Sequence, residues 1–146
     1  MRLLERPERL ALQDKQKKKI VLAIFYRLAQ DGNIVIFLQK RTEFQWEFPG
    51  GKVELNETLV DALQRELHEE VGLEIHASEL EPFRCFTYEY HDKIVDLHCF
   101  LISIDILRFK MDRGHWFSLL EVAQSQFPLI EGSRSIVDSL KRKFYV

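Results

Sequence analysis

Runs of consecutive β-branched and aromatic residues alternate along the chain with polar turn sequences. The first run, residues 20–26, is apolar at nearly every position, which predicts a buried strand. Asp31-Gly32-Asn33 is typical of a turn, and a second apolar run follows it directly. The same criteria predict the remaining strands over residues 34–38, 83–90, 94–104 and 116–118.

Residues 58–71 instead carry apolar side chains at helical spacing. Thr58 is a suitable N-cap, with Asp61 at the third helical position. Gly72 tolerates the left-handed conformation in which helices commonly end. The pattern therefore predicts a helix with a definite start and a definite end.

A second helix is predicted over residues 135–144, and Ser118 with Glu121 resembles a capping box that opens a short third one. Strands outnumber helices and occur in hairpin-like pairs. We therefore expect an α/β (α+β) fold in which helices pack on the faces of a mixed sheet.

Composition narrows the class of protein. The 146 residues are enough for one domain, and 46% hydrophobic with 30% charged residues is a globular balance. The net charge of −2 argues against strong nucleic-acid binding through charge alone. Cys85 and Cys99 match no metal spacing, and we interpret them as buried thiols in a reducing compartment. The apolar runs are too short to span a bilayer and the first residues do not resemble a secretory signal, so a cytoplasmic protein is expected.

Residues 1–19 differ from the rest of the chain, because isolated leucines alternate there with many charges. The segment ends in a basic run at residues 15–19. We expect an extra turn or short helix with a solvated basic end. The alternative is a contact for a polyanion or a partner subunit.

Three carboxylates share one face of the helix predicted over residues 58–71. With about 100° per residue, Glu70 lies about 40° to one side of Glu66 and Glu69 about 60° to the other. Each like-charge pair one turn apart costs about 0.2–0.5 kcal/mol, which a divalent cation would remove. Oxygen ligands favour Mg²⁺ or Mn²⁺ over zinc. The alternative is a solvated face on which Arg65 pairs with Glu69.

The segments beside this helix favour the metal interpretation. Pro49-Gly50-Gly51 supplies a tight turn just before the helix. Glu57 stands at the helix entrance, where it can reach back towards the carboxylate face. A loop–helix–loop unit with four converging acids has the form of a metal–phosphate site.

At this point the segment resembles a known family. Gly51, Glu57 and the run from Arg65 to Leu73 match the signature of the Nudix hydrolases at every defined position. The resemblance extends to the MutT branch through residues 46–52, 88–92 and 115–119. It covers roughly residues 18–144, so we expect a single Nudix domain over 18–146 and an N-terminal extension over 1–17.

The resemblance implies a Nudix-type α/β/α sandwich with a loop–helix–loop metal site. It also implies a pyrophosphohydrolase that uses Mg²⁺ (or Mn²⁺) and converts a nucleoside triphosphate, such as a purine or oxidised purine one, to the monophosphate and pyrophosphate. Arg65 would orient the carboxylates, and Glu57 would assist through the metal cluster. The metal ligands it implies are Glu66, Glu69, Glu70 and the carbonyl of Gly50 or Gly51.

Other residues are candidates for substrate contacts. Lys52 is placed to meet a phosphate, and Lys40 and Arg41 end the second predicted strand near the same cleft. Glu131 stands where MutT relatives that read oxidised guanine have an asparagine. It could accept hydrogen bonds from guanine, or it could be a helix-capping acid.

Several alternatives stay open. The general base is one of the glutamates of the signature or Asp112, since the loop at 105–115 contains no glutamate. Asp96, His98 and Phe100 share one strand face, as a satisfied polar pair or as a wall of the nucleotide pocket.

The function also has alternatives. The substrate could be a triphosphorylated RNA 5′ end, a dinucleoside polyphosphate or a nucleotide sugar. A non-catalytic, nucleotide-binding regulatory module is disfavoured because every acid of the signature is present. We expect a nucleotide as partner, no membrane, and a monomer or homodimer.

Overall fold

A mixed β-sheet forms the centre of the computed structural model, which describes residues 1–5, 7–8, 15–103 and 114–145. Its strand order is β1-β6-β7-β2-β3-β4, with β5 paired to β2 and β8 paired to β3. β2 and β7 are parallel, and the other paired strands are antiparallel. The strands are β1 (Arg2–Leu3), β2 (Gln16–Leu28), β3 (Ile34–Thr42), β4 (Gln45–Glu47), β5 (Gly50–Lys52), β6 (Glu81–Glu89), β7 (Lys93–Ser103) and β8 (Gly114–Ser118).

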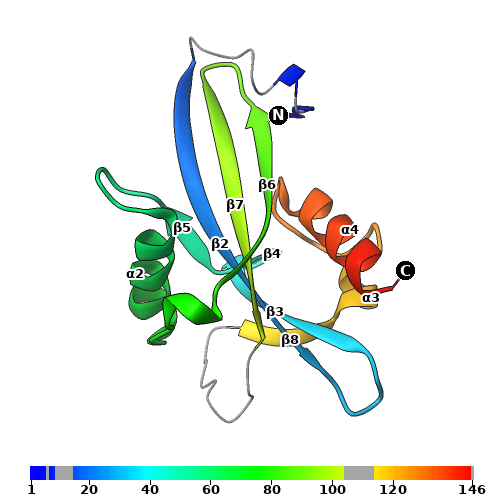
Figure 1. Ribbon diagram of the computed structural model, residues 1–146. Helices are drawn as coiled ribbons and strands as arrows, with labels where there is room; N and C mark the ends of the chain where they lie inside the picture. Colours follow the sequence, from blue (N-terminus) through cyan, green and yellow to red (C-terminus); the bar gives the residue numbers. More distant parts are fainter. Residues whose placement is uncertain (6, 9–14, 104–113, 146) are drawn as a thin grey trace.

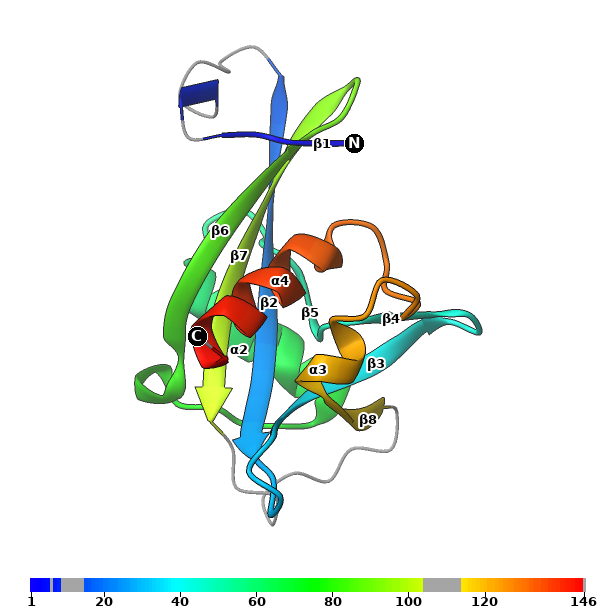
Figure 2. The same ribbon diagram turned by 90° about the vertical axis from the view of Figure 1, so that its right-hand side faces the viewer.

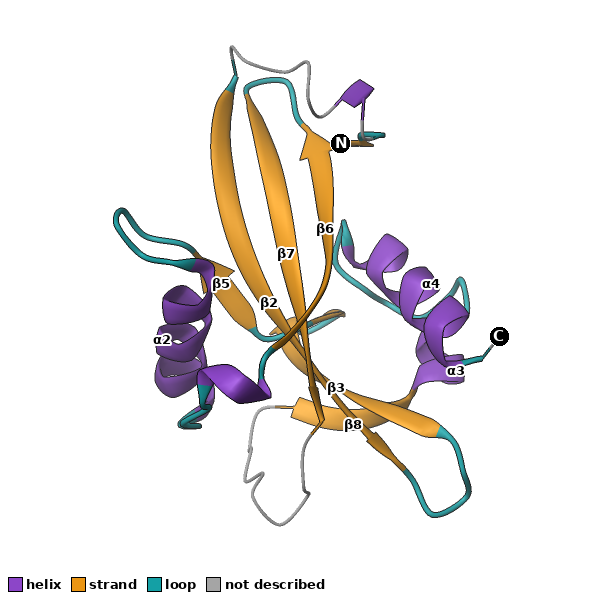
Figure 3. Ribbon diagram, viewed as in Figure 1, coloured by secondary structure: helices purple, strands orange, loops and turns teal. Residues whose placement is uncertain are grey.

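Helices cover both faces of this sheet, which confirms the predicted sandwich. α2 (Leu59–Val71) packs on one face, and α3 (Leu119–Val122) with α4 (Ser133–Phe144) packs on the other (Figures 1 and 3). A short 3-10 helix, η1 (Ala77–Glu79), leads from α2 to β6. Each face has its own apolar core. Phe25, Phe37, Leu63 and Leu67 are central to the core under α2, and Ile24, Leu38, Leu101 and Ile136 to the other.

The ends of α2 follow the sequence closely. The Thr58 hydroxyl accepts a hydrogen bond from the Asp61 amide at 3.0 Å. Gly72 adopts a left-handed conformation with φ of 63°. The capping box predicted at Ser118 is wrong in one respect: α3 does begin there, but the Ser118 side chain makes no capping hydrogen bond. Ser118 is also the last residue of β8, so the start of α3 is determined by the end of that strand rather than by a capping side chain.

Residues 7–8 of the N-terminal segment are helical, as expected, and most of its basic end is exposed. That basic end was not predicted as a strand, yet residues 16–19 form the first part of β2, where Gln16 pairs with Lys93 of β7. Charged side chains occupy both faces of this exposed part of the strand, so the sequence shows no apolar alternation that would predict a strand. The backbone hydrogen bonds with β7 stabilise it instead.

The length of β2 allows it to serve two neighbours along the same edge. Its middle residues pair with β5, Val21 opposite Gly51, and its last residues pair with β3, Tyr26 opposite Ile36. β5 is thereby held against the sheet between β2 and α2. This arrangement places β5 beside α2 (Figure 1), and it makes Gly50 and Gly51 strand residues rather than part of the tight turn that the sequence predicts.

The N-terminal residues join the sheet at the β6 edge. In β1, Arg2 pairs with Glu89 and Leu3 with Tyr88. Figure 2 shows β1 crossing beside the upper part of β6. The Leu4 amide donates to the Thr87 carbonyl at 2.8 Å, and the Leu4 side chain is buried.

Two further predictions concern the cysteines and the membrane. Cys85 and Cys99 form no disulfide; Cys99 is buried as predicted, whereas Cys85 is only half-buried. Burial raises the pKa of the Cys99 thiol well above its usual value. Among the described residues, no helix has the length and apolar character needed to cross a membrane.

Candidate active site

Two glycines allow β5 to lie against its neighbours. Gly50 has φ of 151°, in a region that L side chains rarely adopt. A Cβ on Gly50 would collide with the backbone carbonyl of Val21. A Cβ on Gly51 would collide with the carboxylate of Glu66, which lies directly on the strand backbone. Gly50 and Gly51 therefore form a surface, here called the cradle, on which Val21 and Glu66 lie closer than any residue with a Cβ would allow.

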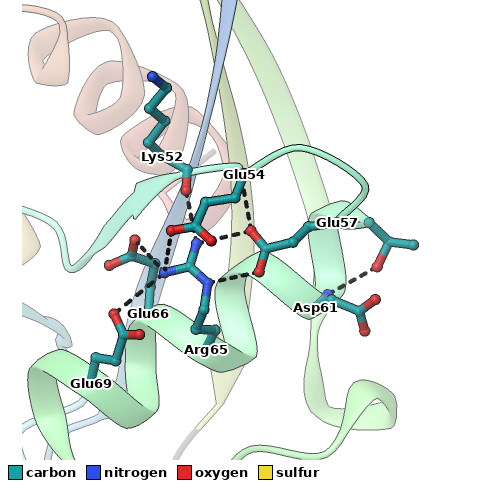
Figure 4. Close-up of polar contacts among 8 residues, drawn as sticks. Lys52, Glu54, Glu57, Asp61, Arg65, Glu66 and Glu69 are labelled. Atoms are coloured by element: carbon teal, nitrogen blue, oxygen red, sulfur yellow. Dashed lines mark hydrogen bonds and ion pairs between the residues drawn. The ribbon is translucent and has the colours of Figure 1, made fainter.

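Arg65 is the centre of the polar contacts on α2 (Figure 4). Its guanidinium donates two hydrogen bonds to Glu57, at 2.7 and 2.9 Å. It also donates to Glu66 at 3.1 Å and to Glu69 at 3.3 Å. A further bond of 3.0 Å reaches the Lys52 carbonyl on β5. One arginine thus fixes the loop before α2, the helix face and the glycine-rich strand relative to one another.

These contacts set the ionisation of the carboxylates. The two hydrogen bonds from Arg65 lower the pKa of Glu57 to about 2, with a smaller effect from the Glu54 amide. Glu66 differs, because its side chain is only 14% exposed. Burial raises the pKa of Glu66, while the hydrogen bond from Arg65 opposes that shift. A cation beside Glu66 would relieve the cost of burying its charge.

Glu70 faces away from Arg65. It accepts hydrogen bonds from the Gln39 side chain at 3.2 Å and from the Gly50 amide at 3.4 Å. Glu47 on β4 also lies close by, because β4 pairs Glu47 opposite Gln39. Burial raises the pKa of Glu47, the charge of Arg41 opposes the shift, and the charge of Glu70 adds to it. Sequence reasoning did not single out Gln39 or Glu47, since only the β3–β4 pairing brings them to the helix.

A cleft of about 750 Å³ opens beside these glutamates on the sheet face that carries α4. At one end it is lined by Gly51, Glu66 and Glu70. Its floor is made by apolar and aromatic side chains of β2, β7 and β6 and of the residue that follows β6, Tyr90. These are Ile20, Leu22, Val95, Leu97, Tyr88 and Tyr90.

Three of the four residues predicted to contact substrate line this cleft, and one does not. Lys52, Arg41 and Glu131 line it, whereas Lys40 does not and lies with its ammonium group 5.6 Å from the Trp46 ring. The side chain of Glu131 is 64% exposed. The α4 N-cap is Gly132 and shows no side-chain capping bond, which argues against the capping interpretation of Glu131. Asp112 lies outside the described residues.

Asp96 and His98 of β7 face away from the cleft. Val95 and Leu97 line it, so Asp96 and His98 point to the opposite face of the sheet. Asp96 accepts a hydrogen bond of 2.6 Å from the Thr87 hydroxyl. The imidazole of His98 lies 4.0 Å from the Cys85 sulfur, and burial lowers its pKa. The satisfied-pair interpretation therefore holds for Asp96, and the wall of the cleft is made by other residues.

The chemistry of the acidic end fits a hard divalent cation. Its donors are carboxylate oxygens, and the cradle at Gly51 leaves Glu66 directed along the strand. Within the described ranges, no three acidic, His or Cys side chains are gathered around one point as they stand. Arg65 holds Glu66 and Glu69, while Gln39 holds Glu70. A cation would therefore have to draw these carboxylates away from their present partners.

Comparison with known proteins agrees with this geometry. The NUDIX domain family model matches residues 17–140. An 8-oxo-dGTP diphosphatase of Escherichia coli (strain K12) is 30% identical over 137 residues, which cover 86% of this chain and 98% of that protein. One from Buchnera aphidicola subsp. Schizaphis graminum is 43% identical over 86 residues, or 57% of this chain and 63% of that protein.

The fold has the same relatives. A structure described as MutT from Aliivibrio salmonicida and Vibrio cholerae superposes with a TM-score of 0.66 at 26% identity. It covers 88% of this chain and 99% of that one. The likeness therefore extends over nearly the whole sandwich rather than over α2 alone.

Proposed function

The chain belongs to the Nudix family, and we propose that it hydrolyses nucleoside triphosphates to the nucleoside monophosphate and pyrophosphate with the help of Mg²⁺. The observation that carries this proposal is the cleft itself, which has the carboxylates of Glu66 and Glu70 at one end and apolar, aromatic side chains along its floor. A triphosphate needs carboxylates that can hold a metal ion beside its phosphates, and a nucleobase needs an apolar, aromatic surface to pack on. The E. coli and Buchnera relatives, both 8-oxo-dGTP diphosphatases, support a nucleoside triphosphate as substrate.

The side chains of this protein would divide the work of binding. Glu66, Glu69, Glu70 and the carbonyl of Gly50 would hold the metal ion, which supplies charge neutralisation of the phosphates and activation of water when bound. Lys52 would contact a phosphate oxygen, with Arg41 near the same end of the cleft. Arg65 would keep the helix, the loop and β5 in register, so that the carboxylates need little reorganisation.

The base that takes the proton from the attacking water stays within the acidic end of the cleft. Glu66, Glu69 and Glu70 are the described candidates, and all three lie on α2. Water attacks one phosphorus, the bridging P–O bond breaks, and pyrophosphate leaves with its negative charge. Burial of Glu66 and the hydrogen bonds to Glu70 hold two of these side chains in defined positions.

The decisive experiment is a substrate panel with product analysis on the full chain. The panel holds normal and oxidised purine triphosphates, pyrimidine triphosphates, a dinucleoside polyphosphate, a nucleotide sugar and a triphosphorylated RNA. We expect nucleoside monophosphate and pyrophosphate from the triphosphates in the presence of Mg²⁺, and none with a chelator. Preferential cleavage of the RNA or of another member would replace the proposed substrate class.

A matched pair of variants tests the site. Glu70→Gln keeps the size of the side chain and should lower kcat by more than about 100-fold, beyond the loss typical of an outer-shell partner. His68→Gln changes an exposed residue on the opposite side of α2 and should leave kcat unchanged. Retained turnover in Glu70→Gln would contradict the role of Glu70 as a metal ligand.

A further inference from the structure

The N-terminal strand is fixed to the edge of the sheet by several independent contacts. Besides the backbone pairing of β1 with β6, the Leu4 side chain is only 4% exposed. Arg2 donates to Glu89 at 3.0 Å, and Lys15 lies 3.3 Å from the same carboxylate. A segment held at so many points has a defined position rather than a loosely attached one.

This strand delivers Met1 to the cleft. The Met1 side chain lines the cleft together with Tyr90 and Glu131. The Tyr90 hydroxyl donates to the Met1 sulfur at 3.2 Å. The Met1 nitrogen lies 3.9 Å from a carboxylate oxygen of Glu131. Met1 is thus placed between the floor of the cleft and the loop that precedes α4.

The position of Met1 relative to the glutamates follows from the sheet topology. From β5, beside the acidic end, the pairing runs through β2, β7 and β6 to β1. Four strand steps of about 4.8 Å place β1 about 19 Å from β5. The carboxylates of Glu66 and Glu70 lie at the first end, and Tyr88, Tyr90 and Met1 lie at the other with Glu131. A nucleotide whose phosphates reach Glu66 and Glu70 therefore extends its base towards Met1.

We propose that Met1, presented by β1, is a specificity-determining residue that closes the nucleobase end of the cleft together with Tyr90 and Glu131. This inference rests on the proposed function, because it assigns the direction in which the nucleotide lies. A thioether is flexible and polarisable, and it packs well against the face or edge of an aromatic base. The same wall would disfavour substrates that continue beyond the base or carry a bulky group there.

The kinetics of two variants in the N-terminal segment, one at Met1 and one in β1, test whether Met1 contacts the substrate. Met1→Ala removes the side chain from the cleft, in protein released from a cleavable fusion that leaves no extra residue. Leu3→Ala is the control, because Leu3 lies on β1 and is absent from the cleft lining. For Met1→Ala we expect KM for the triphosphate to rise about three- to tenfold with kcat nearly unchanged, since the contact exists in ground state and transition state alike. Equal KM values for the two variants would overturn the inference.

Oxidation of the methionine gives a readout that does not depend on turnover. Met1 and Met111 are the two methionines of the chain, so their sulfoxides are resolved by mass spectrometry after peroxide treatment. A non-hydrolysable nucleoside triphosphate should slow Met1 oxidation, whereas pyrophosphate alone should not, because it occupies only the acidic end. If the analogue protects Met1 but the protein does not hydrolyse nucleoside triphosphates, this inference stands and the proposed function is contradicted. If the protein hydrolyses nucleoside triphosphates but the analogue does not protect Met1, the proposed function stands and this inference is contradicted.

Discussion

The two ends of the cleft are built in different ways. Most of the acidic end comes from two neighbouring elements, β5 and α2, within 22 consecutive residues between Gly50 and Val71, and β3 and β4 add Gln39 and Glu47. The opposite end, which we propose holds the nucleobase, joins β6, β7, the loop before α4 and the N-terminal segment, which are far apart in the sequence. The first end is therefore mostly local in sequence, whereas the second brings together segments that become neighbours only in the folded sheet.

This difference has consequences for how each end tolerates substitution. At the acidic end, Arg65 and Gly51 each touch Glu66, so a change at either one reaches a proposed metal ligand directly. At the other end the contacts are single and partly exposed, as with Glu131. We therefore expect large effects on kcat from the first group and small effects on substrate preference from the second.

The largest effect is expected from Gly51→Ala. The added methyl group would occupy the space of the Glu66 carboxylate, so either that side chain or β5 must move. Overpacking of this kind typically costs about 1–3 kcal/mol of stability, and we expect kcat to fall by more than the roughly 100-fold loss of an outer-shell variant. Thermal unfolding and single-turnover hydrolysis measure the two effects.

Leu55→Ala is the control for that variant. Leu55 lies in the loop between β5 and α2, and its side chain is 91% exposed. It should leave both the melting temperature and kcat near those of the parent protein. A fully active Gly51→Ala enzyme would show that Glu66 does not need its cradle.

Substitution of two arginines, one in each region, is expected to have a smaller effect than Gly51→Ala. Arg65 donates to carboxylates, whereas Arg134 donates to the backbone carbonyls of Val122, Gln124 and Phe127 ahead of α4. Lysine keeps the charge of arginine but not its planar set of donors. Arg65→Lys should lower activity by about 10- to 100-fold, as is typical of residues that orient metal ligands.

Arg134→Lys is expected to destabilise the fold while kcat stays within about threefold of the parent value, because its partners are structural. Denaturant unfolding and kcat measured on both variants separate the two roles. Equal losses of activity in both would mean that Arg65 acts through stability alone.

The same contrast explains what the sequence could predict. The start and end of α2 depend on Thr58 and Gly72 themselves, and both were predicted correctly. Glu47 and Gln39 reach Glu70 only through the β3–β4 pairing, and Met1 reaches the cleft only through β1 and β6. Periodicity along one segment carries no information on such pairings. The strand at the basic start of β2 was not predicted for the same reason, since its partner β7 is distant in the sequence, with Lys18 opposite Val95.

The smallest effect is expected at Glu131. Its carboxylate lines the cleft beside Gly132, whose carbonyl is held by the Tyr88 hydroxyl at 2.8 Å. The loop is thus fixed, while the Glu131 side chain is 64% exposed and has the Met1 nitrogen as its neighbour at 3.9 Å. Glu131→Ala should change the ratio of kcat/KM between guanine and pyrimidine triphosphates by about three- to tenfold, the value of one hydrogen bond. The matched change Glu121→Ala, on α3 and outside the cleft lining, should leave that ratio unaltered. If both variants keep the parent profile, base selection rests on the aromatic floor and on Met1 rather than on a carboxylate.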